Sequence, residues 1–225
     1  WGSLARKLAH EIKNPLTPIQ LTIDRLREKY SNLLKEKDSE NFKDNLKIIN
    51  NQIKQIGNLV NEFSDFARMP KPTLRENNLV HLLKENIKLL KELDNSIEID
   101  LSSNAEKIIL NSDKEQISRV FLNLIKNSIE SIQQKVENDS NFNKKITIEL
   151  TENDGHIKLI IVDNGIGFGK FSENIKDILN PYFTTKKNGT GLGLSIVNKI
   201  INDHNGKIEF IPRNDGAKIK INFVK

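Results

Sequence analysis

The sequence predicts an α+β protein in which a helical hairpin precedes an α/β sandwich. From Leu4 to Ala67, apolar residues recur at three- and four-residue steps or their multiples, the period of amphipathic helices. This pattern stops at Pro70 and Pro72, which lack backbone donors and disfavour the α conformation in the residues before them. Beyond them, short alternating runs typical of strands mix with helical periods. We therefore expect two domains, residues 1–69 and residues 73–225.

The composition narrows the class of protein. With 36% hydrophobic and 29% charged residues, the 225-residue chain can bury a core without being membrane-spanning or wholly disordered. The chain has no cysteine, which excludes disulfides, thiol catalysis and Cys-bearing zinc sites. The 35 basic residues are interleaved with 30 acidic ones, so the net charge of +5 indicates a Lys-rich solvated surface rather than a nucleic-acid interface. The sequence shows neither a bilayer-spanning apolar stretch nor an export signal.

Two long amphipathic helices are expected before the prolines. Their apolar residues are Leu8, Ile12, Ile19, Ile23, Leu26, Tyr30 and Leu33, and then Phe42, Leu46, Ile49, Ile53, Ile56, Val60, Phe63 and Ala67. The polar connection from Glu36 to Asn41 supplies Ser39 as an N-cap for the second helix. A lone hairpin covers only part of two apolar stripes, so a second hairpin would complete a four-helix bundle. We therefore expect a homodimer.

The second half alternates between strand and helix patterns. In chain order these are a helix over 79–93, strands near 97–101 and 108–110, a helix over 117–132, strands over 146–150 and 157–162, a helix over 194–203, and strands over 207–211 and 217–224. Such a mixture predicts helices on one face of a mainly antiparallel sheet.

His10 lies in the first candidate site. It stands two residues from both Leu8 and Ile12, roughly 200° around a helix, so it points away from their stripe and should be exposed. A neutral imidazole nitrogen can act as a nucleophile. Glu11, the next residue, could accept the proton of the other ring nitrogen.

Two prolines follow His10 inside the same helical pattern. Pro15 and Pro18 deprive the carbonyls of Glu11 and Asn14 of their usual partners, which indicates a weakened helix that could bend. The alternative is a helix that begins near Pro15. A zinc site of the His-Glu-x-x-His kind is excluded, because its last position holds Asn14.

Glycines and asparagines mark a second candidate site. Asp163–Gly167 follows a strand and Gly189–Leu194 leads into a helix, so backbone N–H groups there could approach phosphate oxygens. Neither cluster is a Walker A loop or a G-x-G-x-x-G motif. Asn123 and Asn127 lie four apart on one helix face, and amide oxygens suit a hard Mg²⁺ ion carried by phosphates. The combination predicts a nucleotide beneath a lid.

Together these segments resemble the bacterial sensor histidine kinases, whose catalytic domain belongs to the GHKL ATPase superfamily with its Bergerat fold. The matching motifs are the H box at His10–Pro15, the N box at Asn123–Asn127, the G1 box at Asp163–Gly167, the F box at Pro181–Lys186 and the G2 box at Gly189–Leu194. Residues 1–30 are most similar to the NtrY-type nitrogen-regulation sensors.

The resemblance implies a role for each motif residue. In the H box, His10 would accept the γ-phosphoryl group of ATP, Glu11 would be the general base, and Asn14 would orient water during dephosphorylation of the partner. In the N box, Asn127 would coordinate Mg²⁺, and Asn123 and Lys126 would support the phosphates.

The remaining motifs would hold the nucleotide. Asp163 would bind the adenine amino group in a pocket shaped by Gly165 and Gly167. The triphosphate side would be lined by Gly189, Thr190, Gly191, Leu192 and Gly193, and Phe183 would pack within the lid. Two residues depart from the family's pattern: Ser128 stands where Ala is common, and Tyr182 where Phe is common.

The implied function is ATP- and Mg²⁺-dependent autophosphorylation of His10, followed by phosphotransfer to an aspartate of a response regulator, with phosphatase activity as well. The implied partner is an NtrX-type receiver domain, with no direct nucleic acid. The chain would be the cytoplasmic portion of an inner-membrane sensor and would contact the membrane only through parts absent from it.

The alternatives are a catalytically silent GHKL scaffold that binds ATP and a regulator, or a GHKL ATPase of the gyrase or chaperone kind. The latter normally has a carboxylate where Asn123 stands.

Overall fold

The computed structural model describes residues 2–31, 33–93, 95–136, 142–168, 178–180 and 190–225. Packing divides the chain into two units, residues 1–70 with 184–192, and residues 71–183 with 193–225. None of the helices in these described ranges is both long and apolar enough to cross a membrane.

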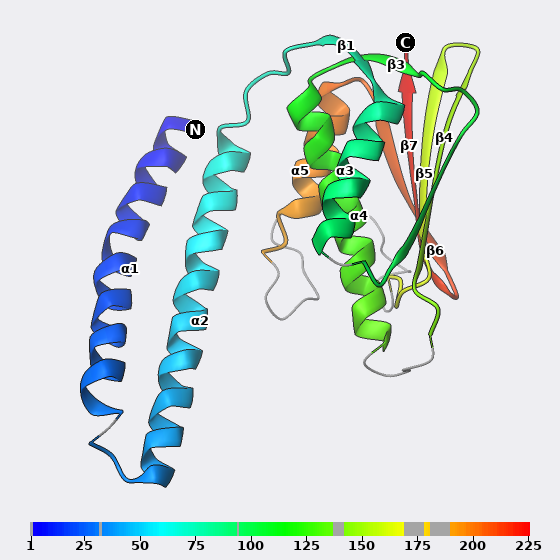
Figure 1. Cartoon of the computed structure of the whole chain (residues 1–225). Helices are drawn as coiled ribbons and strands as arrows, with labels where there is room; N and C mark the ends of the chain where they lie inside the picture. Colours follow the sequence, from blue (N-terminus) through cyan, green and yellow to red (C-terminus); the bar gives the residue numbers. More distant parts are fainter. Residues whose placement is uncertain (1, 32, 94, 137–141, 169–177, 181–189) are drawn as a thin grey trace. The chain divides into compact units, whose positions relative to one another are not determined.

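The first unit contains the expected hairpin, formed by α1 (Gly2–Tyr30) and α2 (Glu36–Ala67) (Figure 1). Its buried apolar residues are Ala9 and Ile23 on α1 and Leu46, Ile53 and Val60 on α2. Leu16 and Phe42 pack against the cluster that Ile23, Leu46 and Ile53 form. The helical periodicity therefore predicted both helices and much of the seam between them.

α1 runs through Pro15 and Pro18, as its apolar period predicts, so the alternative of a helix that begins near Pro15 is wrong. One local expectation in the hairpin was also wrong. Ser39 is not an N-cap, because α2 already begins at Glu36 after Lys35, which makes no side-chain capping bond. The Ser39 hydroxyl instead donates to the carbonyl of Ser31 at 2.8 Å and thereby ties the first turn of α2 to the end of α1.

Much of the predicted apolar stripe is uncovered in the single chain. Leu8 and Ile12, which flank His10, are 42% and 43% exposed, because Ala9 rather than either of them is buried in the hairpin. Ile19 on α1 and Ile56 on α2 are exposed as well. Each helix thus buries one narrow seam and leaves a second apolar strip outside it.

The second unit contains a five-stranded sheet. Its strands are β2 (Glu98–Ser103), β4 (Lys145–Asn153), β5 (His156–Asp163), β6 (Lys207–Arg213) and β7 (Gly216–Val224), in the order β2-β4-β5-β7-β6. Among the strand pairs of this sheet in the described residues, β2 and β4 run parallel and the other three pairs are antiparallel. The mainly antiparallel sheet was therefore correctly predicted.

Two further short strands, β1 (Arg75–Asn78) and β3 (Ile109–Ser112), pair with each other outside that sheet. The sequence did not predict β1, because Arg-Glu-Asn-Asn has no apolar alternation. The strand is instead held by its pairing and by Asn77, whose amide donates to the carbonyl of Ser112 at 2.7 Å.

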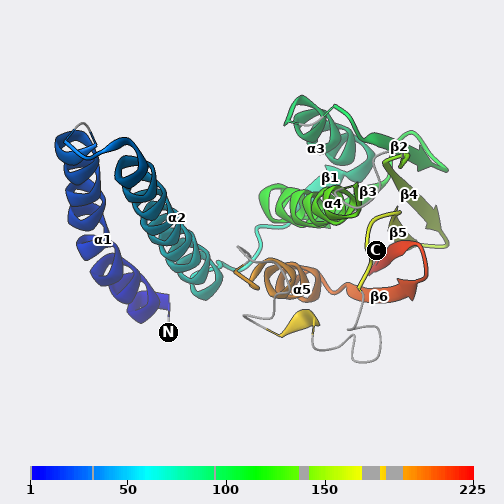
Figure 2. The ribbon, with the colours of Figure 1, turned by 90° about the horizontal axis from the view of Figure 1, so that it is seen from below.

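Three helices cover one face of the five-stranded sheet: α3 (Leu79–Leu93), α4 (Lys114–Val136) and α5 (Gly193–Asp203) (Figure 2). Fully buried core residues include Ile117, Leu124 and Ile132 on α4 and Ile146 and Ile148 on β4. Alternate residues of β4 are exposed, as expected for a sheet with one covered face. This arrangement is the predicted α/β sandwich.

Candidate functional site

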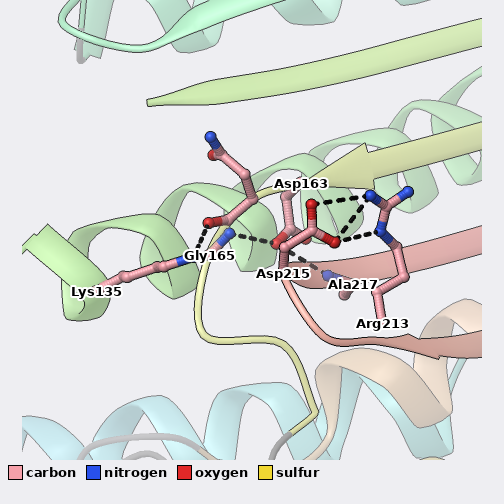
Figure 3. A network of polar contacts seen from close by, with 7 residues as sticks. Lys135, Asp163, Gly165, Arg213, Asp215 and Ala217 are labelled. Carbon is pink, nitrogen blue, oxygen red and sulfur yellow. Dashed lines mark hydrogen bonds and ion pairs between the residues drawn. The ribbon is translucent and has the colours of Figure 1, made fainter. Parts of the chain in front are cut away.

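Asp163 is the last residue of β5, and its carboxylate is the centre of the candidate site in the second unit. Oδ1 accepts hydrogen bonds from the backbone N–H groups of Gly165 at 3.0 Å and Ala217 at 3.3 Å (Figure 3). Oδ2 accepts the hydroxyl hydrogen of Ser128 on α4 at 3.0 Å. One side chain, only 4% exposed, is thus held by β5, the loop after it, α4 and β7.

The electrostatics of Asp163 are set first by burial. Burial raises the pKa of this carboxyl above its ordinary value, although the hydrogen bonds from Gly165, Ser128 and Ala217 and the charge of Arg213 act in the opposite direction. The Arg213 guanidinium forms a two-pronged pair with Asp215, with contacts of 2.9 and 3.1 Å (Figure 3). A buried carboxyl with a raised pKa is a candidate functional group.

Glycines let the backbone approach this carboxylate closely. A Cβ on Gly165 would lie 2.3 Å from Ser131 Oγ, and one on Gly167 would lie 2.5 Å from the carbonyl oxygen of Gly216. Gly216 itself has φ +120°, and a Cβ there would lie 2.0 Å from the carbonyl oxygen of Asp163. Side chains at these positions would push apart the loop after β5, α4 and the β6–β7 turn.

The loop after β5 is anchored on both sides of Gly165. The Asn164 side chain accepts from the N–H of Lys145 at 3.0 Å and donates to the carbonyl of Asn143. Its backbone carbonyl accepts from Lys135 Nζ at 2.8 Å. On the other side, the ring of Phe168 packs edge-on against Phe210 with centroids 5.9 Å apart. The loop therefore has a defined position relative to the sheet.

The two asparagines predicted as phosphate and metal ligands lie on successive turns of α4. Asn123 is half-buried and faces the start of α5, since a Cβ on Gly193 would lie 3.6 Å from its Oδ1. Asn127 is half-buried one turn further along. Lys126 is exposed and pairs with Glu130 at 3.9 Å, so its ammonium has a partner on its own helix.

The segment before α5 has a defined local conformation. Gly191 has φ +71°, and the N–H of Leu192 lies 3.4 Å from the hydroxyl oxygen of Thr190. Leu192 is buried. α5 then begins at Gly193 with no acidic residue in its first turn, which leaves the positive end of its dipole uncompensated from within the helix. Two other predicted residues, Phe183 and Gly189, lie outside the described residues.

His10 lies in the first unit and is exposed on α1, as predicted. It borders a cavity of about 430 Å³ between α1 and α2. The other lining residues are Ala9, Lys13, Asn61, Ser64, Asp65 and Arg68. Glu11 and Asn14 are exposed on the same helix. The imidazole can thus be reached from solvent. The polar cavity beside it contains two cationic side chains and the carboxylate of Asp65, which lies 3.8 Å from Arg68.

Sequence reasoning missed three contributors to the Asp163 site. Ser128 was noted only as a departure from a family pattern, whereas its hydroxyl contacts the carboxylate directly. Gly216 and Ala217 are the first two residues of β7, 53 and 54 residues after Asp163 in the sequence. The Asn-Asp-Gly turn before Ala217 could have indicated a tight hairpin, but no local signal places it against Asp163.

Among the described side chains, no group of three His, Asp or Glu residues could hold a metal ion.

Comparison with protein families gives two matches. Residues 112–224 match the family described as Histidine kinase-, DNA gyrase B-, and HSP90-like ATPase. Residues 1–72 match the His Kinase A (phospho-acceptor) domain.

Curated relatives match nearly all of the chain. An NtrY-like sensor histidine kinase of Rickettsia felis is 38% identical over 224 residues, which is 99% of this chain and 36% of the relative. The nitrogen regulation protein NtrY of Azorhizobium caulinodans is 36% identical over 98% of this chain and 28% of its own length. The chain therefore spans about a third of the length of these relatives.

Solved structures agree with the fold. The catalytic domain of the histidine kinase ThkA aligns over 68% of this chain and 95% of its own, with 30% identity and a TM-score of 0.57. ThkA in complex with the response regulator protein TrrA aligns over 100% of this chain and 61% of its own, with 27% identity and a TM-score of 0.68.

Proposed function

Because the chain belongs to the histidine kinase family, we propose that it transfers the γ-phosphoryl group of ATP to His10 and then to an aspartate of a response regulator. In the first step a ring nitrogen of His10 forms a bond to Pγ, the bond from Pγ to the β–γ bridging oxygen breaks, and ADP leaves. The observation that carries the proposal is an exposed histidine on a phospho-acceptor hairpin, joined in one chain to a buried carboxylate that closely packed glycines surround.

In the proposed nucleotide complex, Asp163 accepts a hydrogen bond from the adenine amino group, and Gly165 and Gly167 allow the base to approach. The positive end of α5 and the residues Gly189, Thr190, Gly191, Leu192 and Gly193 bind the triphosphate.

The half-buried amides of α4 fit a magnesium ion that is carried by phosphates, because Mg²⁺ prefers oxygen ligands and usually takes few of them from protein. Asn127 would supply one oxygen, with Asn123 and Lys126 beside the phosphates. The ion would neutralise charge on the transferring group.

On the hairpin, we assign Glu11 as the acceptor of the His10 ring proton and Asn14 as the residue that orients water in the phosphatase reaction. Both are exposed on α1 near His10. Lys13 and Arg68 line the cavity that borders His10. Their charges would offset that of a phosphoryl group on the imidazole.

We further propose a homodimer in which the exposed apolar strips of two hairpins pack together, with domains at residues 1–69 and 73–225. Leu8, Ile12 and Ile56 are more than two-fifths exposed in the single chain, which favours such burial. By similarity to the NtrY relatives, the partner is an NtrX-type receiver domain, and the region is the cytoplasmic part of an inner-membrane sensor.

The test is incubation of the chain with γ-labelled ATP and Mg²⁺, beside His10→Ala and the control His156→Ala, whose histidine is exposed on β5. We expect label that is acid-labile and base-stable in the wild type and the control, and no label in His10→Ala. ATP binding without any label on the wild type would contradict kinase activity and support a silent scaffold.

A further inference from the structure

We propose that Ser128 is a positioning residue that leaves Oδ2 of Asp163 with one open acceptor site and so makes the pocket selective for a 6-aminopurine over a 6-oxopurine. The inference rests on the proposed role of Asp163 in binding the base. It goes beyond that role, because it assigns selectivity to Ser128 on α4, a residue outside the glycine-containing segment that follows β5.

The two carboxylate oxygens of Asp163 differ in the number of hydrogen bonds that they accept. An ionised carboxylate offers about two acceptor sites on each oxygen. Oδ1 of Asp163 already accepts from Gly165 and Ala217, at 3.0 and 3.3 Å. Among the described residues, Oδ2 accepts a hydrogen bond from Ser128, at 3.0 Å. One further donor can therefore be received, and it must be received at Oδ2.

Burial fixes the direction of the Ser128 hydroxyl. Ser128 is 2% and Asp163 is 4% exposed, so bulk water does not compete for either group. An ionised carboxylate can only accept, which means that the hydroxyl hydrogen points from Ser128 toward Oδ2. The carboxylate is held at one oxygen by backbone and at the other by α4, and it cannot turn without losing a bond.

This arrangement distinguishes two classes of purine. A 6-amino group can donate to the open site on Oδ2, whereas a 6-oxo group would set its own lone pairs against those of the carboxylate. Only a protonated Asp163 could donate to a 6-oxo group. The Ser128 bond stabilises the ionised form and therefore works against acceptance of the oxo base.

Other charges near the carboxylate are unchanged by substitution of Ser128. Arg213 on β6 acts on Asp163 from one side and is paired with Asp215. Lys135 on α4 is bound to the carbonyl of Asn164 (Figure 3). With Ser128 replaced by alanine, Oδ2 loses its donor while burial continues to favour the neutral acid, so the pKa of Asp163 should rise further.

The experiment measures the affinities of the full chain for ATP and for ITP, a 6-oxopurine nucleotide, by calorimetry between about pH 5.5 and 8.5. The variants are Ser128→Ala, Ser128→Cys with its weaker donor, and the control Ser112→Ala, a buried serine on β3 whose hydroxyl donates to Leu110. We expect Ser128→Ala to weaken ATP binding about tenfold, the equivalent of about 1.4 kcal/mol. The ratio of ATP to ITP affinity in Ser128→Ala should fall most at the acidic end of this pH range. The ratio in Ser128→Cys should lie between those of Ser128→Ala and the wild type. Ser112→Ala should have the wild-type ratio.

Two results would overturn the proposal: Ser128→Ala with the wild-type ratio of ATP to ITP affinity at every pH, or an equal loss for both nucleotides that does not change with pH. If Ser128→Ala does not fold, Ser128→Cys carries the same test. The variant Asp163→Asn distinguishes a failure of the role proposed for Asp163 from a failure of the role proposed for Ser128. Wild-type ATP affinity in that variant would refute the assignment of Asp163 itself, whereas its loss beside an unaltered Ser128→Ala would refute only the role of Ser128.

Discussion

The backbone N–H of Asp113 donates a hydrogen bond to Nε2 of His204 at 3.0 Å. Nδ1 of the same ring lies 2.7 Å from the carbonyl oxygen of Ile200, so this nitrogen carries the hydrogen and Nε2 accepts. His204 is 5% exposed. The ring thus joins the end of α5 to the residue that precedes α4, the two helices that carry residues of the proposed nucleotide site.

Replacement of His204 by alanine should destabilise the chain. The change leaves the N–H of Asp113 without its partner and opens a space at the end of α5, a combined loss of about 2–3 kcal/mol. Urea unfolding followed by circular dichroism at pH 7.5 measures it. The control is His81→Ala, which removes an exposed ring paired with Glu85 and should change stability by less than about 0.5 kcal/mol. Equal losses in both variants would contradict a structural role for the His204 bridge.

Asp113→Ala should make the protein less sensitive to acid. Burial acts to raise the pKa of this carboxyl, but bonds from the N–H groups of Thr73, Gln116 and Glu115 outweigh it and hold the pKa below its ordinary value. A carboxyl with a lowered folded pKa contributes stability above its unfolded pKa, about 3.9, and loses it as pH falls through the folded pKa. The stability gap between wild type and variant should therefore be full at pH 6 and should shrink below about pH 4. A gap that stays constant over this range, or a similar pH dependence for Asp44→Ala on α2, would contradict this account.

Asp163→Asn should separate stability from nucleotide binding. Burial raises the pKa of Asp163, so the native state holds its proton to higher pH than the unfolded chain does. Stability from this group is then greatest at low pH and declines as pH rises from about 3.9 to the raised folded value. The amide removes that decline and can still accept from Gly165 and Ala217. We expect Asp163→Asn to be at least as stable as the wild type at pH 7 but to have lost ATP affinity. Reduced stability at pH 7 in urea unfolding would refute the pKa argument.

Gly216→Ala should disrupt the site from a distance in sequence. Its φ of +120° disfavours a side chain, and the added Cβ would meet the Asp163 carbonyl oxygen at 2.0 Å. A loss of about 2–4 kcal/mol is expected, together with loss of ATP binding. Gly155→Ala is the matched control, because Gly155 also has a positive φ, +75°, but has nothing within 4 Å. It should cost about 1–2 kcal/mol and leave ATP binding unchanged. ATP affinity that falls equally in both variants would show that contact with Asp163 is not the cause.

The sequence predicted the elements with strong periodicity and missed those set by tertiary contacts. α3 has the bounds that its pattern predicts, Leu79–Leu93, because a single apolar face dictates a helix there. β1 was missed because its four polar residues have no alternation and depend on β3 for pairing. Ser39 was assigned as a cap because serine favours that position, whereas its bond to Ser31 crosses the hairpin loop, which no local rule describes.

The residues of the candidate site also differ in whether the sequence could predict them. Asp163, Gly165 and Gly167 form one contiguous motif, and the structure places all three around one turn. Ala217 could not be found from the sequence, because its contribution is a backbone N–H that any residue except proline carries. Its importance comes only from the register of β7 beside β5, which pairs Ala217 with Asp163.

The dependence of Asp163 on Ala217 also sets an order of events during synthesis. β7 follows both β5 and β6 in the sequence but lies between them in the sheet. Until the ribosome has released it, the carboxylate lacks one of its backbone donors and β5 lacks a neighbour. A nascent chain that already displays the complete His10 hairpin therefore still lacks part of the hydrogen-bonded surroundings of Asp163.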